Sequence, residues 1–370
     1  MNRGQIHVNL LWCAAGRVGG SEEYLVRQLL GLPDGIRAVV HLGRALAESR
    51  PELHRHELVI AGIDVDRRAP RIVAEHTALA ASTRAASLVH HGGGTMPVVR
   101  PSAPTVLTVH DLQYRRFPQY FSRGRRTYLQ QMMPRSVRAA TIITTPTAHV
   151  ADDVAESFGV DRQRILVVPH GVSPGDVGPA DIARVRQTHL GGGEGRLLLY
   201  PAITHPHKGH GLLIDAFSRW SEPDDRLVLI GGVGHAESEV MSAVQRLGLA
   251  DRVTRLGRVP ALERDALIAA SDLVVVPSEE EGFGAPVLEA MAAGTPVVAS
   301  RIGALAEVVG DAGVLVERDV DALVDAIRLV LSDPEPWSVR GRDRAREFTI
   351  EISGSALHDA YREAIDRGSR

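Results

Sequence analysis

The chain has 370 residues, a length that accommodates about two domains of ~150 residues each. Its composition is globular, with 44% hydrophobic residues, 24% charged residues and a formal net charge of −3, so nucleic acid is not an expected partner. The one cysteine, Cys13, lies in an apolar run, which excludes an internal disulfide framework and favours a cytoplasmic location. No apolar run approaches the ~18 residues of a membrane span, and we interpret 6–15 as a first strand rather than a signal peptide.

Short apolar runs alternate with helical patterns over residues 1–171, which is typical of a parallel sheet covered by helices. The first strand is expected at 6–13, before a Gly-rich turn and a helix that Ser21 caps. This turn lacks the G-x-G-x-x-G spacing of a dinucleotide-binding fingerprint, but it makes a helix N-terminus that can accommodate phosphate. Further strands are expected at 38–42, 58–60, 87–90, 105–109, 139–145 and 165–168, and helices at 71–81 and, after the N-cap Thr147, 148–158.

Two features suggest a metal ion, but neither predicts a metal site. The DVD triplets at 64–66 and 319–321 could hold a divalent ion on a diphosphate, but such triplets are common by chance and Asp319 stands at a helix start. Three histidines near one another, His205, His207 and His210, raise the option of zinc. Pro206 and the lack of a fourth nearby ligand argue against it.

Residues 115–138 carry seven arginines interspersed with aromatic side chains. Three interpretations stay open for this segment. It can be a solvated helix face, an acceptor site that recognises hydroxyls and any anionic group, or a weak peripheral contact with a membrane surface.

A Pro/Gly cluster at 169–175 marks the boundary between two doubly wound patterns. We therefore expect a first domain over 1–171, a second over 172–350 and a final helix within 351–370. In the second half, strands are expected at 196–201, 227–231, 252–256, 273–276, 297–299 and 313–316, and helices at 180–189, 212–220, 262–270, 285–293, 320–331 and 352–365.

The stretch 275–300, VVPSEEEGFGAPVLEAMAAGTPVVAS, predicts a complete strand–loop–helix–strand unit. Its loop, 281–284, is expected where the carboxyl end of a strand meets a helix N-terminus, which is the ligand-binding edge of an open parallel sheet. Gly282 and Gly284 would present bare N–H donors there. Glu281 and Glu289 could direct two carboxylates at a polyhydroxylated ligand. The alternative is that Glu281 only caps the helix and Glu289 is solvated.

This stretch resembles the glutamate-pair motif of the retaining glycosyltransferases of family GT4, which have the GT-B fold. The resemblance covers essentially the whole chain and is strongest over 196–316. It implies an α/β protein of two Rossmann-like doubly wound domains facing a central cleft. The first domain would bind the acceptor, the second would bind a nucleotide sugar, and the last helix would cross back to the first.

The resemblance also implies roles for individual residues. The segment 108–112 (TVHDL), followed by 117–122, resembles the family stretch whose histidine contacts the donor sugar, so the implied catalytic residues are His110, Lys208 and Glu281. Lys208 would neutralise a diphosphate, but the arginine that normally accompanies it is missing near Ile203. The implied donor-binding residues are Gly19, Gly20, Lys208, Arg258, Val259, Gly282, Phe283, Gly284 and Glu289. No metal and no cofactor is implied.

The expected reaction is transfer of a hexose, with retention, from a nucleotide sugar to a hydroxyl of a saccharide or glycolipid acceptor, as in polysaccharide biosynthesis. The Pro-His-Lys variant at 206–208 most resembles mannosyltransferases that use GDP-mannose. A UDP-glucose or UDP-hexosamine transferase is the alternative, and an inactive sugar-nucleotide-binding protein of the same fold is another. A phosphorylase would need a longer chain with a pyridoxal lysine, and an epimerase would lack the glutamate pair. We expect a cytoplasmic protein, with weak contact at the inner membrane face as an option. Acceptor identity and oligomeric state are not predicted.

Overall fold

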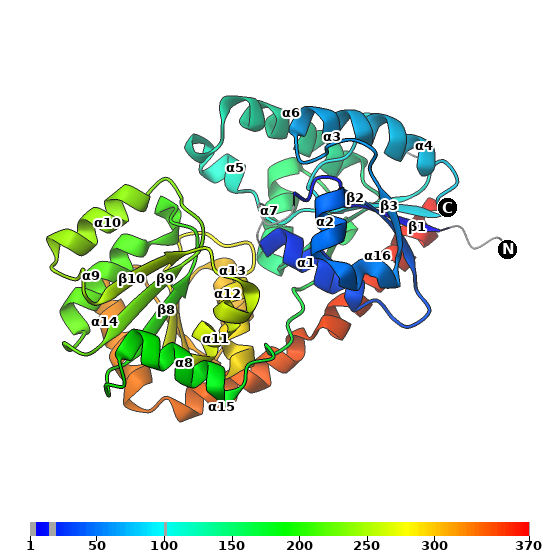
Figure 1. The fold of residues 1–370 in the computed structure, drawn as a ribbon. Helices are drawn as coiled ribbons and strands as arrows, with labels where there is room; N and C mark the ends of the chain where they lie inside the picture. The colour runs from blue at the N-terminus through cyan, green and yellow to red at the C-terminus, as the bar shows by residue number, and fades with distance from the viewer. Residues whose placement is uncertain (1–4, 15–19, 100–101, 370) are drawn as a thin grey trace. The chain divides into compact units, whose positions relative to one another are not determined.

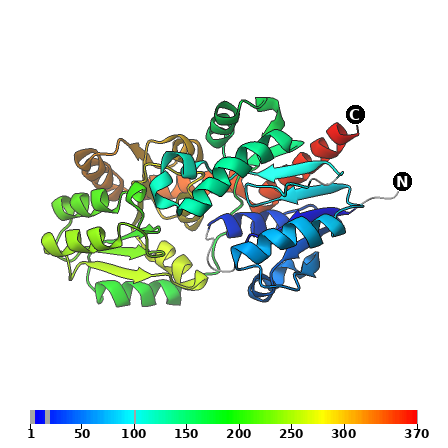
Figure 2. The ribbon, with the colours of Figure 1, turned by 90° about the horizontal axis from the view of Figure 1, so that it is seen from above.

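The computed structural model describes residues 5–14, 20–99 and 102–369, which form two compact units. The first unit contains the residues up to Gly171 together with those from Phe348 onward, and the second is Val172–Glu347. Each unit is built on one sheet with helices packed on its faces (Figure 1, Figure 2). No helix in the described ranges combines the length and apolar composition needed to cross a bilayer.

The first unit has a seven-stranded sheet in the order β3-β2-β1-β4-β5-β6-β7, with every neighbouring pair parallel. Its strands are β1 (Ile6–Asn9), β2 (Ala38–Leu42), β3 (Glu57–Ile60), β4 (Leu88–His91), β5 (Thr105–Thr108), β6 (Ile142–Thr145) and β7 (Ile165–Val167). Its helices are α1 (Gly20–Leu30), α2 (Arg44–Ser49), α3 (Arg68–Ala74), α4 (Ala80–Ser82), α5 (Gln113–Arg116), α6 (Arg123–Ala139), α7 (Ala148–Phe158) and α16 (Ile350–Gly368).

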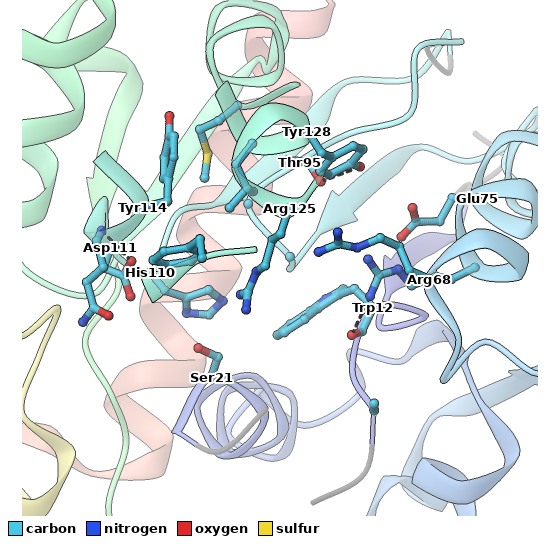
Figure 3. Close-up of a pocket in the computed structure, with 18 of the residues that line it drawn as sticks. Trp12, Ser21, Arg68, Glu75, Thr95, His110, Asp111, Tyr114, Arg125 and Tyr128 are labelled. Carbon is cyan, nitrogen blue, oxygen red and sulfur yellow. Dashed lines mark hydrogen bonds between the residues drawn. The ribbon is translucent and has the colours of Figure 1, made fainter. Parts of the chain in front are cut away.

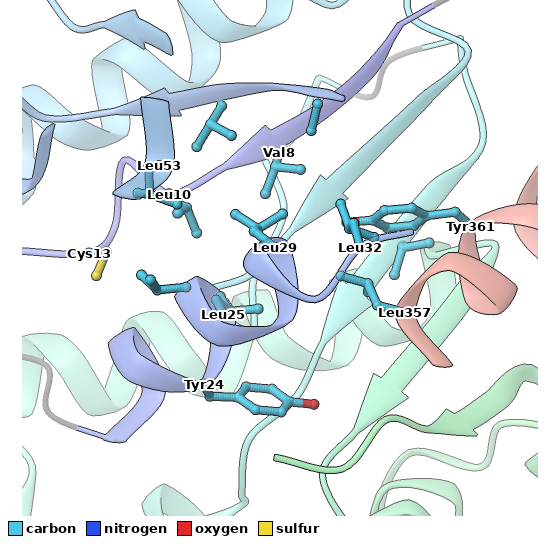
Figure 4. Packing of buried hydrophobic residues seen from close by; sticks show 14 of the residues in the cluster. Val8, Leu10, Cys13, Tyr24, Leu25, Leu29, Leu32, Leu53, Leu357 and Tyr361 are labelled. Atoms are coloured by element: carbon cyan, nitrogen blue, oxygen red, sulfur yellow. The ribbon is translucent and has the colours of Figure 1, made fainter. Parts of the chain in front are cut away.

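Helices α1 and α16 bury the main core of this unit. Leu25 and Leu29 of α1 pack with Val8 of β1, and Leu357 and Tyr361 of α16 belong to the same cluster (Figure 4). Cys13 is buried in this core, as the sequence predicted. A second cluster joins β5 and β6 to α6 and α7. Side chains fully withdrawn from water each contribute about 1.5–3 kcal/mol, so these clusters fix the sheet that carries the loops described below.

Close backbone packing holds α16 on the first unit. A Cβ atom added to Gly354 would lie 1.9 Å from the carbonyl carbon of Gly31, so glycine is required at this contact. Tyr361 Oη lies 2.9 Å from His90 Nδ1, and His90 Nε2 lies 2.8 Å from Thr108 Oγ1. Burial lowers the pKa of His90 to about 3, so this link is made by a neutral imidazole.

The second unit has a six-stranded parallel sheet in the order β10-β9-β8-β11-β12-β13. Its strands are β8 (Leu197–Pro201), β9 (Arg226–Ile230), β10 (Val253–Gly257), β11 (Leu273–Val276), β12 (Val297–Ser300) and β13 (Val314–Val316). Its helices are α8 (Pro179–Leu190), α9 (His210–Trp220), α10 (Glu237–Arg246), α11 (Ala261–Ala270), α12 (Ala285–Ala293), α13 (Gly303–Val309), α14 (Val320–Ser332) and α15 (Glu335–Ala345). Both strand orders are doubly wound and Rossmann-like, which confirms the predicted α/β class.

Several element boundaries differ from the prediction. The strand expected at 139–145 begins at Ile142, because α6 continues to Ala139. The Ala140 amide still donates to the Ser136 carbonyl, in the helical pattern. Strand β1 ends at Asn9, where the chain turns toward Cys13. The helix expected at 71–81 begins at Arg68 and contains a π-helical turn over Glu75–Leu79. Ser21 lies inside α1 rather than before it.

The predicted N-cap Thr147 and the predicted structural role of Asp319 at a helix start are confirmed. The Thr147 side chain accepts a hydrogen bond from the Val150 amide at the start of α7. The Asp319 side chain accepts one from the Ala322 amide at the start of α14, so this acid of the second DVD triplet has the structural role expected for it.

Candidate functional site

The second sheet places two predicted residues on neighbouring loops. Its strand order reverses between β8 and β11, the two central strands that pair with each other. Loops after such strands diverge to opposite faces of the sheet and leave a crevice at its carboxyl edge. Lys208 follows β8 and Glu281 follows β11, so both residues stand at this switch point.

Lys208 and Glu281 form an ion pair with 2.7 Å between Nζ and Oε1. Only 12% of the Lys208 side chain and 13% of the Glu281 side chain are exposed. Ser278 Oγ donates to the same carboxylate oxygen at 2.7 Å, and Tyr200 Oη donates to the Lys208 carbonyl at 2.7 Å. Ser278 therefore holds the carboxylate, and Tyr200 holds the backbone from which the Lys208 side chain extends.

The loop 281–284 leads into α12, as predicted. Gly284 is its N-cap, with φ 94°, and the Glu281 carboxylate is bound by Lys208 and Ser278. The alternative that Glu281 only caps this helix is therefore wrong. A Cβ atom added to Gly284 would lie 2.4 Å from Leu305 Cδ2, so the close packing of α13 also requires glycine here. Phe283 is buried, and Gly282 is half-buried.

Glu289 lies on α12, and its side chain is 13% exposed. Its Oε2 is 3.7 Å from Arg264 Nε, and Arg264 also donates to Asp265 at 3.0 Å. The alternative that Glu289 is a solvated surface acid is therefore wrong. Its carboxylate is enclosed and lies next to a cation.

The remaining predicted residues of the second unit lie along the same sheet edge. Arg258 and Val259 follow β10, the edge strand two positions from β8, and Arg258 is exposed. Ile203 carries no charge, but the structure places a different arginine beside the β11 loop. Arg318, which follows β13, donates from Nε to the Pro277 carbonyl at 3.2 Å. Sequence reasoning missed it because β13 is two strands from β11 in the sheet.

The three neighbouring histidines do not assemble a metal site. The described part of the chain contains no cluster of three His, Cys, Asp or Glu side chains arranged to hold a metal ion. His205 instead stacks on His235, with 3.1 Å between their Nδ1 atoms. Burial lowers the pKa of His207 to about 3 and that of His210 to about 4.

In the first unit, His110 follows β5 and is half-buried. Its Nε2 donates to the Gly92 carbonyl at 2.8 Å, because a carbonyl oxygen can only accept. The rings of Tyr24 and Trp12 flank it, with centroids at 5.4 Å and 5.8 Å. Burial lowers the pKa of His110, so the neutral ring keeps Nδ1 as a hydrogen-bond acceptor.

His110 opens onto a cavity of about 530 Å³ at the carboxyl edge of the first sheet (Figure 3). This volume lies within the ~300–1,000 Å³ typical of small-molecule sites. The residues used below that line it are Trp12, Asp66, Arg68, Arg71, Glu75, Gly93, His110, Asp111, Phe121, Arg125 and Tyr128. Trp12 lies flat against Gly93, where a Cβ atom would approach its Cγ to 2.6 Å. The sequence suggested an acceptor site at 115–138 as one of three interpretations, but it did not indicate that Trp12 or α3 would line the same cavity.

The glycine turn before α1 is only partly described. Gly19 lies outside the described residues. Gly20 is the first residue of α1 and is exposed. The acids after it, Glu22 and Glu23, both pair with Arg50, at 2.9 Å and 2.7 Å.

Two family models match the chain. The model of glycosyl transferases group 1 matches residues 181–348, and the model of glycosyltransferase family 4 matches residues 18–176. Together these segments cover most of both structural units.

Individual relatives agree with the family models. O-antigen chain mannosyltransferase B of Escherichia coli is 30% identical over 270 residues, 70% of each chain. MMP alpha-(1->4)-mannosyltransferase of Mycolicibacterium hassiacum is 30% identical over 294 residues, 75% of this chain and 69% of that protein. D-inositol 3-phosphate glycosyltransferase of Segniliparus rotundus is 34% identical over 231 residues, 59% of this chain and 51% of that protein. The matched part thus spans between half and seven tenths of these relatives.

Solved structures share the fold of both units. Anabaena Alr3699/HepE, in a complex with UDP-glucose, superposes with a TM-score of 0.76 at 22% identity, covering 96% of this chain and 98% of that one. Sucrose-phosphate synthase from Thermosynechococcus elongatus superposes with a TM-score of 0.74 at 22% identity, covering 97% and 98%. At this identity the likeness concerns the fold. The chain therefore belongs to the group 1, family 4 glycosyltransferases, and it has their GT-B fold.

The enclosed ion pair predicts coupled stability effects. We expect Lys208→Met or Glu281→Gln alone to destabilise the second unit by about 1–3 kcal/mol, because each leaves a charge without its partner away from water. The double variant should lose less than the sum of the two. Chemical unfolding of all four proteins measures this coupling. The exposed pair Arg219–Asp321 of the same unit is the control and should show less than about 0.5 kcal/mol. Additive losses at Lys208 and Glu281 would contradict the coupling.

The environment of His110 predicts its protonation behaviour. Because its folded pKa is lowered from 6.5, the ring should be neutral at pH 7, with its proton on Nε2. As pH falls below 6.5, His110 of the unfolded chain becomes protonated to the cation before His110 of the folded chain does. This difference should reduce the stability of the fold. Long-range ¹H–¹⁵N NMR of histidine-labelled protein, with His110→Asn to assign the signal, measures both tautomer and titration. A titration at or above 6.5, or a proton on Nδ1, would show that the burial argument fails.

Proposed function

We propose that the protein transfers a hexose from a nucleotide sugar to an acceptor hydroxyl with retention at the anomeric carbon. The observation that carries this proposal is the Lys208–Glu281 pair at the switch point of the second sheet. A cation and a carboxylate on adjacent loops suit a ligand with both a diphosphate and sugar hydroxyls. Membership of the glycosyltransferase family supports the same reaction class.

Leaving-group departure is the chemical problem of this reaction. The bond between the anomeric carbon and the diphosphate oxygen breaks, and a bond from that carbon to the acceptor oxygen forms. The proton of the acceptor hydroxyl passes to the departing diphosphate. Lys208 and the amino ends of α9 and α12 would stabilise the negative charge that develops.

Binding of the diphosphate would then change the partner of Lys208. Its Nζ would turn from Glu281 to the phosphate oxygens, and Glu281, still held by Ser278, would accept hydrogen bonds from sugar hydroxyls. Glu289 would accept the ribose hydroxyls. Gly282, Phe283 and Gly284 would line the diphosphate, and Arg258 and Val259 would lie along the base. His110 would accept a hydrogen bond from a donor-sugar hydroxyl.

For the donor we propose GDP-mannose, because two relatives are named as mannosyltransferases. A UDP sugar is the second candidate, since the Anabaena structure of the same fold contains UDP-glucose. We propose that the acceptor is a saccharide or glycolipid. We also propose that the reaction needs neither a metal ion nor a cofactor, since Lys208 and two helix N-termini already supply positive charge.

A nucleotide panel tests the proposal. Thermal shifts of the full chain with GDP, UDP, ADP and TDP, each with and without magnesium, should single out one nucleotide, and Lys208→Met should remove its shift. A GDP shift that does not depend on magnesium is expected. A shift with UDP alone would overturn the mannose donor and keep the transferase. No shift with any nucleotide, or an unchanged shift in Lys208→Met, would contradict the proposed site.

A further inference from the structure

The first unit holds three arginines that converge on the 530 Å³ cavity. Arg68 and Arg71 belong to α3, and Arg125 belongs to the first turn of α6. Figure 3 shows Arg68 and Arg125 reaching toward the space beside the Trp12 indole from different sides. Two helices far apart in the sequence therefore bring positive charge to one place.

These guanidinium groups form no close ion pair. None of the three makes an ion pair with a carboxylate within 4.0 Å in the ranges that the structure describes. Arg68 and Arg125 stand over the rings of Tyr128 and Phe121, at 5.9 Å and 4.9 Å from the ring centroids. Arg71 donates from Nη1 to a backbone carbonyl at 3.3 Å, while its buried Nε makes no hydrogen bond to a described residue.

The acids that line the cavity act on these arginines only at longer range: the charge of Arg71 partly opposes the rise in the pKa of Glu75, and Asp111 acts on Arg125. Glu75 is buried and accepts a hydrogen bond from Asn9 Nδ2 at 3.3 Å, and burial raises its pKa. Asp111 accepts from the Gln113 amide at 3.0 Å, and Asp66 is exposed.

Like charges oppose one another at Arg125. Arg125 is an exposed residue that also lines the cavity, and its pKa is lowered first by partial burial and then by the positive charge of Arg68, with a smaller contribution from Arg71. Asp111 acts in the opposite direction but does not cancel these effects. Bringing three cations together costs free energy unless an anion joins them.

We propose that this cavity binds an acceptor that carries a phosphate, with the phosphate between Arg68, Arg71 and Arg125 and a sugar-like ring against Trp12. Guanidinium groups bind phosphate through paired N–H donors, which favours arginine at such a site. The flat indole gives the apolar face of a sugar ring a surface to pack on. The identification of this ligand as the acceptor rests on the proposed function, whereas the phosphate site itself rests on the cavity alone. A sugar phosphate and a phosphorylated lipid headgroup share this chemistry.

Calorimetric titration of the full chain tests the proposal. A Lys208→Met background removes the lysine proposed to bind phosphate in the second unit. Glucose 6-phosphate is compared with glucose, inorganic phosphate is the minimal probe, and phosphatidylinositol vesicles are compared with phosphatidylcholine vesicles. We expect at least one phosphorylated probe to bind tenfold or more tightly than its neutral counterpart. Preference for the vesicles would identify the lipid source, and preference for glucose 6-phosphate the soluble one.

Matched variants connect the preference to the cavity. Arg68→Gln and Arg125→Gln should each weaken the phosphorylated probe at least tenfold, while Arg123→Gln, an exposed arginine on α6 outside the cavity lining, should not. No preference for any phosphorylated probe, or an equal loss in Arg123→Gln, would overturn the proposal. Nucleotide thermal shifts of Arg68→Gln and Arg125→Gln, measured with Lys208 intact, keep the two proposals separate. If the nucleotide shifts of these variants are unchanged and no phosphorylated probe is preferred, the phosphate-bearing acceptor is refuted and the proposed transferase function is not.

Discussion

An ion pair held largely away from water, Lys208 with Glu281, is the interaction on which the site of the second unit depends. Removing two charges from water is costly, and a 2.7 Å contact with a further hydrogen bond from Ser278 offsets that cost. The pair is formed because β8 and β11 are neighbours in the sheet, although their loops are about seventy residues apart in the chain. A ligand with a diphosphate and hydroxyls would give Lys208 the diphosphate and Glu281 the hydroxyls as new partners, so that neither charge would be left unpaired.

The two units use the same architecture to gather different charges. In each, loops at the carboxyl edge of a doubly wound parallel sheet carry the chemistry. The second unit presents one lysine already matched by a carboxylate. The first presents three arginines that lack such a match within the described ranges. This difference fits the proposed donor site of the second unit, which is preorganised, and the proposed acceptor site of the first unit, whose positive charge only a bound anion would neutralise.

Local signals explain what the sequence could predict. Helix α12 has the predicted bounds, 285–293, because glycines mark both of its ends. Helix α7 has them too, because Thr147 caps its start and Gly159 ends it in the left-handed conformation. By contrast, α6 carries Pro134 inside it and many arginines, which hid its apolar spacing and moved the predicted start of β6. The partner of Glu281, the position of Arg318 and the cavity over Trp12 depend on strand order and on contacts between distant segments. No local pattern encodes these contacts. The sequence pattern and the family resemblance pointed to Lys208 and Glu281 separately, but not to the ion pair between them.

Hydrogen–deuterium exchange of the full chain, with and without a saturating nucleoside diphosphate, tests the central claim most directly. If the diphosphate binds at the switch point of the second sheet, backbone amides at 208–212 and 281–287 should exchange more slowly in its presence, because they belong to the two loops and the helix N-termini that would contact it. Exchange in the other strands of that sheet should change little. Protection confined to other segments, or none in these two at saturation, would contradict the account.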